Sequence, residues 1–270
     1  MRKVVAAAVL VLTTAPTHAF ATITSFAQYN QITTARDLVF KAASGGAFGG
    51  TLSSRTTQNA AAGTPTQSVF DLLVAANGGT PIPGITADFT FNATTTQAAA
   101  TVGSVLIQGG FSGSFSFTYE GATPLVINGL SYSAGTNLLT GTFTNATLTG
   151  NLNGSSGAVF DSGPGNTSGV SNIYYTSSVV SFVNDSANDL ALTLTSVSPS
   201  FGVTNGHLNG FGAVGTGSFS SDPVPLVNGG IPAPELGTWG MMVMGFGLIG
   251  GTIRSRRIGA RVASRRPEFA

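Results

Sequence analysis

Apolar and polar residues alternate with a period of two along this chain from about residue 87 onward, and the alternation stops at glycine, asparagine or proline. In the segment FSGSFSFTYE, Phe115 and Phe117 would point to one side while the serines between them point to the other. Leu192 and Leu194 alternate in the same way with threonine. This pattern is typical of strands with one face in a core and one in water. We expect residues 86–222 to form one antiparallel sandwich, with these four side chains facing inward.

Turn signals separate the alternating runs at short intervals. They are Gly109-Gly110, Asn128-Gly129, Gly135, Asn153-Gly154, Gly163-Pro164-Gly165 and Asn205-Gly206. Short strands at such spacing, with hardly any helical period, predict a mainly β protein with an antiparallel sandwich or jelly-roll-like domain. A parallel β-helix is the alternative, but that fold needs a constant short repeat. The segment LLTGTFTNATLTGNLNG repeats only loosely, so the sandwich is favoured.

The first part of the domain, residues 22–85, has a weaker pattern. The segment RDLVFK, residues 36–41, predicts a strand. Residues 67–76 carry more apolar side chains than one helical face needs, so a buried helix and a strand both fit. We favour a short helix there because Gln67 and Asp71 interrupt any alternation.

Charge is scarce and unevenly distributed, since Asp, Glu, Lys and Arg make up only 8% of the chain. No lysine or arginine occurs between Arg55 and Arg254. Residues 22–231 contain three basic residues against eight acidic ones, a net charge of −5. A mildly acidic body offers no electrostatic attraction for nucleic acid, so we expect no nucleic-acid partner. The chain has no cysteine, which removes disulfides, thiolate nucleophiles and zinc–thiolate sites.

Several short motifs resemble catalytic or binding motifs without their context. The segments GFGAVG (210–215) and GFGLIG (245–250) match G-x-G-x-x-G, but neither lies in a βαβ unit. Asp161-Ser162-Gly163 resembles the surroundings of a protease serine, but such a serine needs a histidine as its base. The only histidine beyond residue 18 is His207, which we expect at the surface where a strand starts. The acidic residues show no clustering along the chain. We therefore expect no catalytic residue, no cofactor and no nucleotide site.

The segment NDSAND, residues 184–189, is a short oxygen-rich stretch. It allows a calcium loop or an Asx-type turn between strands. The absence of EF-hand spacing favours the turn, and we assign no metal ligand.

The N-terminal segment has the layout of a secretory signal peptide. Arg2 and Lys3 precede an apolar stretch over residues 4–12, and Ala19 and Ala21 form an A-x-A cleavage pattern. The apolar stretch is shorter than the roughly 20 residues of a membrane span. We expect cleavage after Ala21 and export of the chain.

The C-terminal segment combines a proline-rich linker, an uncharged run and a basic cluster. The linker covers residues 223–235, the run of eighteen uncharged residues covers 236–253, and the tail covers 254–270. The run predicts a short transmembrane helix, and the arginines after it predict a cytoplasmic tail by the positive-inside rule. The remaining region, residues 22–222, is the expected secreted β domain.

This C-terminal arrangement resembles the PEP-CTERM sorting signal over residues 232–257, with Leu236 and Gly240 standing where members carry proline and alanine. The residues that carry the resemblance are Pro234, Glu235, Trp239, Met241, Met242, Gly245, Phe246, Gly247, Arg254, Arg256 and Arg257. The resemblance implies processing by an exosortase-like membrane enzyme, a transient stay in the inner membrane, and a final place in the cell envelope or outside the cell. It also implies an association with extracellular polysaccharide or biofilm.

Three hypotheses follow for the β domain. The first is a non-catalytic envelope or matrix protein. The second is a carbohydrate-binding module, whose candidate stacking residues are the five tyrosines Tyr29, Tyr119, Tyr132, Tyr174 and Tyr175. A row of two or three of them on one open face would favour this module. The third is a secreted hydrolase, which would need two carboxylates within about 10 Å of each other in a cleft. We rank the hypotheses in this order.

Overall fold

The computed structural model describes residues 24–73, 80–163, 172–182, 188–221 and 223–226. The chain divides into a unit of residues 1–226 and a second unit of residues 227–270. All described residues belong to the first unit. They form strands and connecting turns, and no helix of theirs is long and apolar enough to cross a membrane. The helix expected over residues 236–253 lies outside the described residues.

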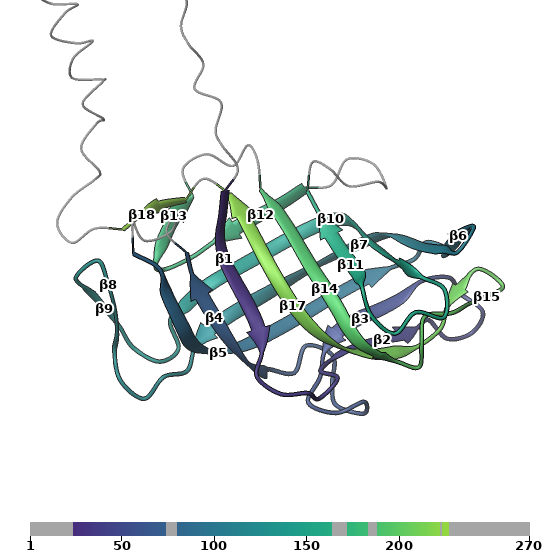
Figure 1. The fold of residues 1–270 in the computed structure, drawn as a ribbon, viewed down its shortest axis with the longest axis horizontal. Coiled ribbons are helices and arrows are strands. Elements are labelled where there is room, and N and C mark those ends of the chain that lie inside the picture. Colours follow the sequence, from purple (N-terminus) through teal and green to yellow (C-terminus); the bar gives the residue numbers. More distant parts are fainter. Residues whose placement is uncertain (1–23, 74–79, 164–171, 183–187, 222, 227–270) are drawn as a thin grey trace, which may run out of the picture. The chain divides into compact units, whose positions relative to one another are not determined.

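Twelve strands form one antiparallel sheet (Figure 1). They are β1 (Thr24–Gln31), β2 (Leu38–Ala42), β3 (Gly50–Ser54), β4 (Thr66–Leu72), β5 (Ile82–Thr95), β6 (Ala100–Val102), β7 (Val105–Tyr119), β10 (Asn137–Asn151), β11 (Ala158–Ser162), β12 (Asn172–Thr176), β14 (Asp189–Ser198) and β17 (Phe211–Ser221). Three two-stranded pairs complete the fold. They are β8 (Leu125–Ile127) with β9 (Leu130–Tyr132), β13 (Val180–Phe182) with β18 (Pro223–Pro225), and β15 (Val203–Thr204) with β16 (His207–Leu208).

The large sheet closes on itself. Its ladders join β1, β4, β5, β7, β10, β11, β14 and β17 in turn, and β17 pairs again with β1. Neighbours in this ring mostly follow one another along the chain, whereas a jelly roll is built from Greek-key connections. Closure leaves the eight ring strands without long unpaired edges, which are a liability for edge-to-edge association.

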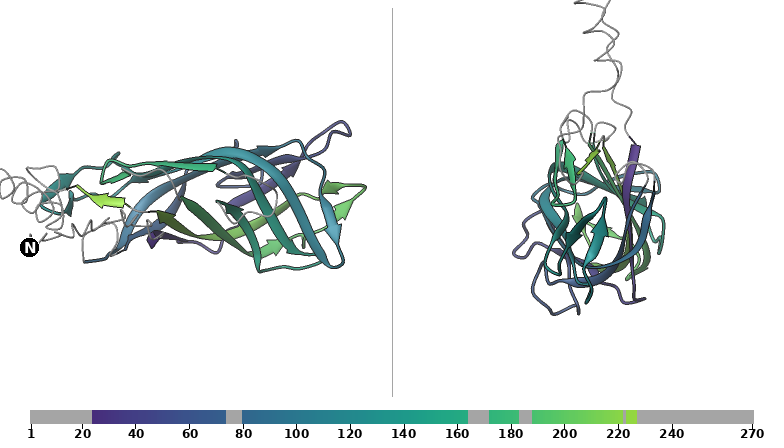
Figure 2. Two further views of the ribbon diagram at one scale, coloured as in Figure 1. Left: turned by 90° about the horizontal axis from the view of Figure 1, so that it is seen from above. Right: turned by 90° about the vertical axis from the view of Figure 1, so that its left-hand side faces the viewer.

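The closed sheet has a front and a back layer that face each other across the core, so the expected sandwich-like, mainly β character is confirmed. Strands β4, β1, β17 and β14 form the front layer in Figure 1 and cross steeply over β5, β7 and β10 behind them. Figure 2 shows the same two layers from above and from one end. Aromatic side chains from both layers meet between them. Phe117 of β7 lies 4.8 Å from Phe70 of β4 and 5.5 Å from Phe219 of β17, measured between ring centroids.

The predicted register of the alternating strands is confirmed. Phe115, Phe117, Leu192 and Leu194 are all buried in the core, while Thr193 between the two leucines is exposed. Because side chains alternate with a period of two, a shift by one residue would have exposed all four.

Residues 24–72 belong to the same sheet as the rest, and the helix favoured over residues 67–76 is wrong. Thr66–Leu72 is strand β4, paired with β1 and β5, and residues 74–76 lie outside the described residues. The alternation is present but hidden by a buried serine. Ser68 faces inward and donates a hydrogen bond to the carbonyl of Ala87 at 3.0 Å. Gln67 and Asp71 face outward, so they mark the solvent face of a strand rather than a helix.

The turn predictions are confirmed in part. Asn128-Gly129 and Asn205-Gly206 connect hairpins β8–β9 and β15–β16, and all four residues have positive φ, as type I′ turns require. Gly109-Gly110 is different, because it lies inside β7. Gly110 has φ +72° at an irregularity in the β7–β10 ladder, so it is a bulge rather than a turn.

Candidate binding groove

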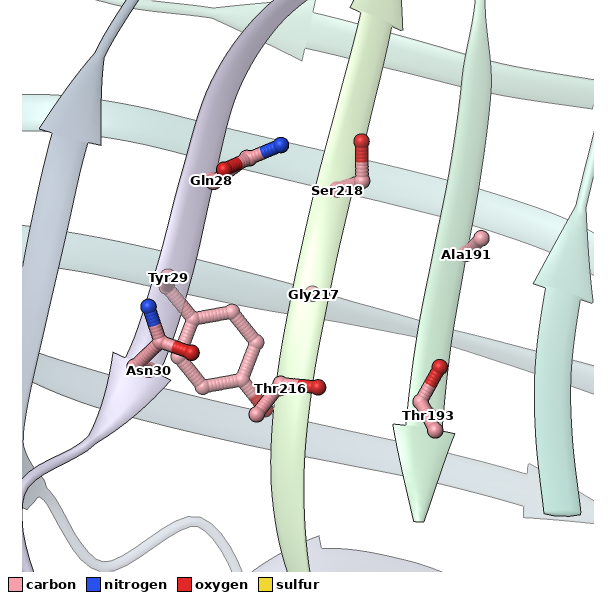
Figure 3. Close-up of a pocket in the computed structure, with 8 residues that line it drawn as sticks. All are labelled: Gln28, Tyr29, Asn30, Ala191, Thr193, Thr216, Gly217 and Ser218. Carbon is pink, nitrogen blue, oxygen red and sulfur yellow. The ribbon is translucent and has the colours of Figure 1, made fainter. Parts of the chain in front are cut away.

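A polar groove of about 270 Å³ lies on the outer face of the front layer, across β1, β17 and β14 (Figure 3). Two cross-strand rows build its walls. The first row is Gln28, Ser218 and Ala191, and the second is Asn30, Thr216 and Thr193. The residues come from three strands far apart in sequence. The pairing of β17 with both β1 and β14 brings them together.

The floor of the groove is the backbone of Gly217 with the ring of Tyr29 behind it. Tyr29 and Gly217 are directly paired in the β1–β17 ladder, and Figure 3 shows the Tyr29 ring between these strands. A Cβ atom on Gly217 would lie 2.5 Å from Cε1 of Tyr29, closer than carbon atoms approach. The glycine therefore leaves room for the ring.

Most of the polar side chains along the groove are free to bind a ligand. Within the described part of the chain, the side chains of Gln28, Asn30, Thr193 and Thr216 make no hydrogen bond. Ser218 is the exception, since its Oγ lies 2.9 Å from Oγ of Ser25. None of the eight lining residues is charged. Amides and hydroxyls both donate and accept hydrogen bonds, so the groove suits a neutral ligand rich in hydroxyl groups.

A carboxyl pair lies one strand beyond the groove. Asp161 of β11 is paired with Ala191 in the ladder, and its side chain shares a hydrogen bond with that of Asp189. Partial burial raises the pKa of both groups, and the charge of Asp189 raises the pKa of Asp161 further. Gly163 makes room for the pair, because a Cβ there would lie 2.1 Å from Oδ1 of Asp189. The two groups thus hold a proton between them more readily than isolated carboxyls do.

The backbone beside this pair is held by buried side chains. Tyr175 donates a hydrogen bond from its hydroxyl to the carbonyl oxygen of Asp189. Asn188 donates from Nδ2 to the carbonyl of Ile173 at 3.0 Å and accepts a hydrogen bond from Oγ of Ser221 at 2.6 Å. These contacts join β12, β14 and β17 at one end of the domain.

The acidic residues show no clustering along the chain, so the sequence did not reveal the Asp161–Asp189 pair. These two residues lie far apart along the chain, and only the β11–β14 ladder brings them together. The pair does not have the glycosidase arrangement, in which carboxyls stand about 5 Å or more apart. It also lies outside the residues that line the groove. The described residues contain no group of three or more His, Cys, Asp or Glu side chains placed to hold a metal ion. Residues 184–187 of the NDSAND segment lie outside the described part.

The other residues considered from the sequence are dispersed. His207 begins strand β16, as predicted, and stacks on Phe48 with ring centroids 4.8 Å apart. Most of the GFGAVG segment lies in β17, so it forms strand rather than a phosphate loop. Three of the five tyrosines, Tyr29, Tyr119 and Tyr175, are buried in the core, Tyr132 is half-buried, and only Tyr174 is exposed. The structure thus contains no row of exposed tyrosines among its described residues.

The sorting-signal residues and the signal-cleavage residues Ala19 and Ala21 lie outside the described residues. Of the eight groove residues, only Tyr29 was a candidate from the sequence, as a stacking residue, and its ring is buried. The sequence TSFAQYNQ, residues 24–31, has polar residues at its outward-facing positions. The solvent face of any strand has the same pattern, so it does not indicate a binding site. Comparison with protein-family models, with curated proteins and with solved structures found no match.

Proposed function

We propose that this protein is an exported, non-catalytic protein of the cell envelope or extracellular matrix, sorted through its C-terminal segment. In this proposal an exosortase-like membrane enzyme processes the chain near Pro234 or Glu235. A short transmembrane helix over residues 236–253 holds the chain until then, and Arg254, Arg256 and Arg257 keep its end in the cytoplasm. The order of signal peptide, cation-poor body, proline-glutamate element, apolar run and basic cluster supports this function.

In this function the β domain binds a neutral, hydroxyl-rich polymer, and extracellular polysaccharide is the candidate polymer. The observation that carries this assignment is the groove over Gly217. It presents Gln28, Asn30, Thr193 and Thr216 to solvent without hydrogen-bond partners among the described residues and without a charge on its lining. Binding in the groove does not require a reaction of the ligand, which agrees with a non-catalytic matrix protein.

Mass spectrometry of the mature protein recovered from the producing cells tests the sorting proposal. We expect an N-terminus after Ala21 and a C-terminus near Pro234 or Glu235. A chain that retains Trp239 and the arginines would contradict processing. It would leave a protein anchored by its C-terminal segment.

Binding of the mature protein to neutral polysaccharide released from the same cells tests the groove. The double variant Asn30→Ala/Thr216→Ala should bind more weakly, because it removes an amide and a hydroxyl from the second row of the groove. The matched control is Thr51→Ala, on strand β3 outside the groove. Equal affinity of wild type, double variant and control would contradict a binding role for the groove.

A further inference from the structure

A second polar surface lies on the outer face of the back layer. Its central row crosses four strands and contains Asn92 of β5, Ser114 of β7, Thr142 of β10 and Tyr174 of β12. These residues are directly opposite one another in successive ladders. All four side chains are exposed. Since neighbouring strands lie about 4.8 Å apart, the row spans roughly 14 Å.

The side chains of this central row make no hydrogen bond within the described part of the chain. The row beside it is also uncharged, and it consists of Thr90, Ser116, Thr140 and Thr176. Among the described residues of β5 and β7, the carboxylate on this face is that of Asp88, a further row away, opposite Thr118. At the β3 end of the row, Arg55 donates a hydrogen bond from Nε to Oγ of Ser53, the residue opposite Asn92, and its side chain is buried. The exposed side chains of the central row therefore offer hydroxyls and one amide to a partner.

Tyr174 gives this surface an apolar platform. Its side chain is 54% exposed, whereas the next residue, Tyr175, faces the core. No other aromatic ring of the described residues contacts Tyr174. An aromatic face beside a row of hydroxyls matches a sugar ring, which has an apolar C–H face and hydroxyls at its edge.

We propose that this face is a second binding surface for a neutral polysaccharide, with a sugar ring stacked on Tyr174 and the chain running across β10, β7 and β5. The inference rests on the proposed function, in which the groove binds the same class of polymer. The groove lies on the outer face of the front layer, with the core between the two surfaces. One molecule can therefore hold two polysaccharide chains, or two segments of one chain, and cross-link the matrix that contains it.

The experiment uses the mature protein and neutral polysaccharide released from the producing cells. Polysaccharide is immobilised, protein is added, and capture of a second, fluorescently labelled sample of the polysaccharide is measured. Wild-type protein should bind and capture the labelled chains. Tyr174→Ala should weaken binding about threefold to tenfold, the usual contribution of one aromatic contact, and should reduce capture. Tyr174→Phe keeps the ring and should restore both. The matched control is Val102→Ala, which changes another exposed apolar side chain, on strand β6.

The outcomes separate this inference from the function on which it rests. Loss of labelled-chain capture in both Tyr174→Ala and the groove variant Asn30→Ala/Thr216→Ala, with residual binding in each, supports two surfaces. Unchanged binding and capture in Tyr174→Ala, together with loss of binding in the groove variant, would overturn the second surface and leave the groove. Absence of polysaccharide binding in wild-type protein would overturn both.

Discussion

Tyr29 occupies the space that a side chain on Gly217 would need. The two residues are paired in the β1–β17 ladder, and a Cβ on Gly217 would lie 2.5 Å from one atom of the tyrosine ring and 2.6 Å from another. The ring also packs against Phe89 and Phe117 of the back layer, with centroids 4.7 and 5.1 Å away. This pair therefore links the floor of the groove to the core.

Gly217→Ala should destabilise the domain by about 1–3 kcal/mol, because the ring is held on its other side and cannot move away freely. Urea denaturation measures the change. Thr193→Ala, an exposed substitution in the same groove, should change the free energy of unfolding by less than about 0.5 kcal/mol. Equal stability of Gly217→Ala and wild type would show that the ring has room to shift.

Tyr29→Phe should stabilise the domain, by up to about 1 kcal/mol. The Tyr29 hydroxyl is buried and has no hydrogen-bond partner among the described residues, and an unpaired buried hydroxyl costs free energy. Tyr175→Phe is the matched control, because it removes the hydroxyl that donates to the carbonyl of Asp189 and should destabilise by about 1 kcal/mol. Thermal unfolding of both variants measures the change in stability, which should have opposite signs in the two. A loss of stability in Tyr29→Phe would contradict the unpaired state of that hydroxyl.

The Asp161–Asp189 pair should make the domain more stable at acidic pH. The pKa of each group is higher in the folded protein than its ordinary value, so folding favours the protonated form. This contribution is fully present below the ordinary carboxyl pKa of about 4, and it is lost as the pH rises through the raised values.

Asp161→Asn should flatten this part of the stability–pH profile, because asparagine can donate the hydrogen bond to Asp189 without a titrating proton. Asp161→Ala removes the donor and should be less stable than Asp161→Asn at every pH. Denaturation series between about pH 3 and 8 measure the difference between wild type and each variant. Since the pKa of Asp37 and of Asp88 is also raised, the difference from wild type is the informative quantity. Parallel profiles of wild type and Asp161→Asn would rule out the shared proton.

Glu235→Ala should leave export intact but prevent C-terminal processing, since the N-terminal signal is unchanged and the proline-glutamate element is altered. Fractionation should then find a full-length form in the membrane. Neutral replacements of Arg254, Arg256 and Arg257 should instead weaken the orientation of the span. Processing of Glu235→Ala at the wild-type level would refute the role of this element.

The sequence by itself determined the fold class, the inward face of several strands and two of the hairpin turns. These properties depend on neighbouring residues. Alternation at Phe115 and Phe117, or at Leu192 and Leu194, sets which side faces the core, and Asn-Gly pairs adopt the positive φ angles of a tight hairpin. The helix prediction at β4 was wrong because neighbouring residues do not show that Ser68 is buried. Its hydrogen-bond partner lies on another strand, so a polar residue occupies an inward position of the alternation.

Only the tertiary structure decided which strands are neighbours, and both polar surfaces follow from that. The groove exists because β17 pairs with β1, which brings Thr216 beside Asn30. Asp161 and Asp189 meet because β11 pairs with β14, and Tyr174 extends the row of Thr142 because β12 pairs with β10. Outward-facing side chains contribute little to the choice of strand partners, because water solvates them in any arrangement. The packing of the buried aromatic side chains selects the pairing, and the composition of each outer surface follows from it.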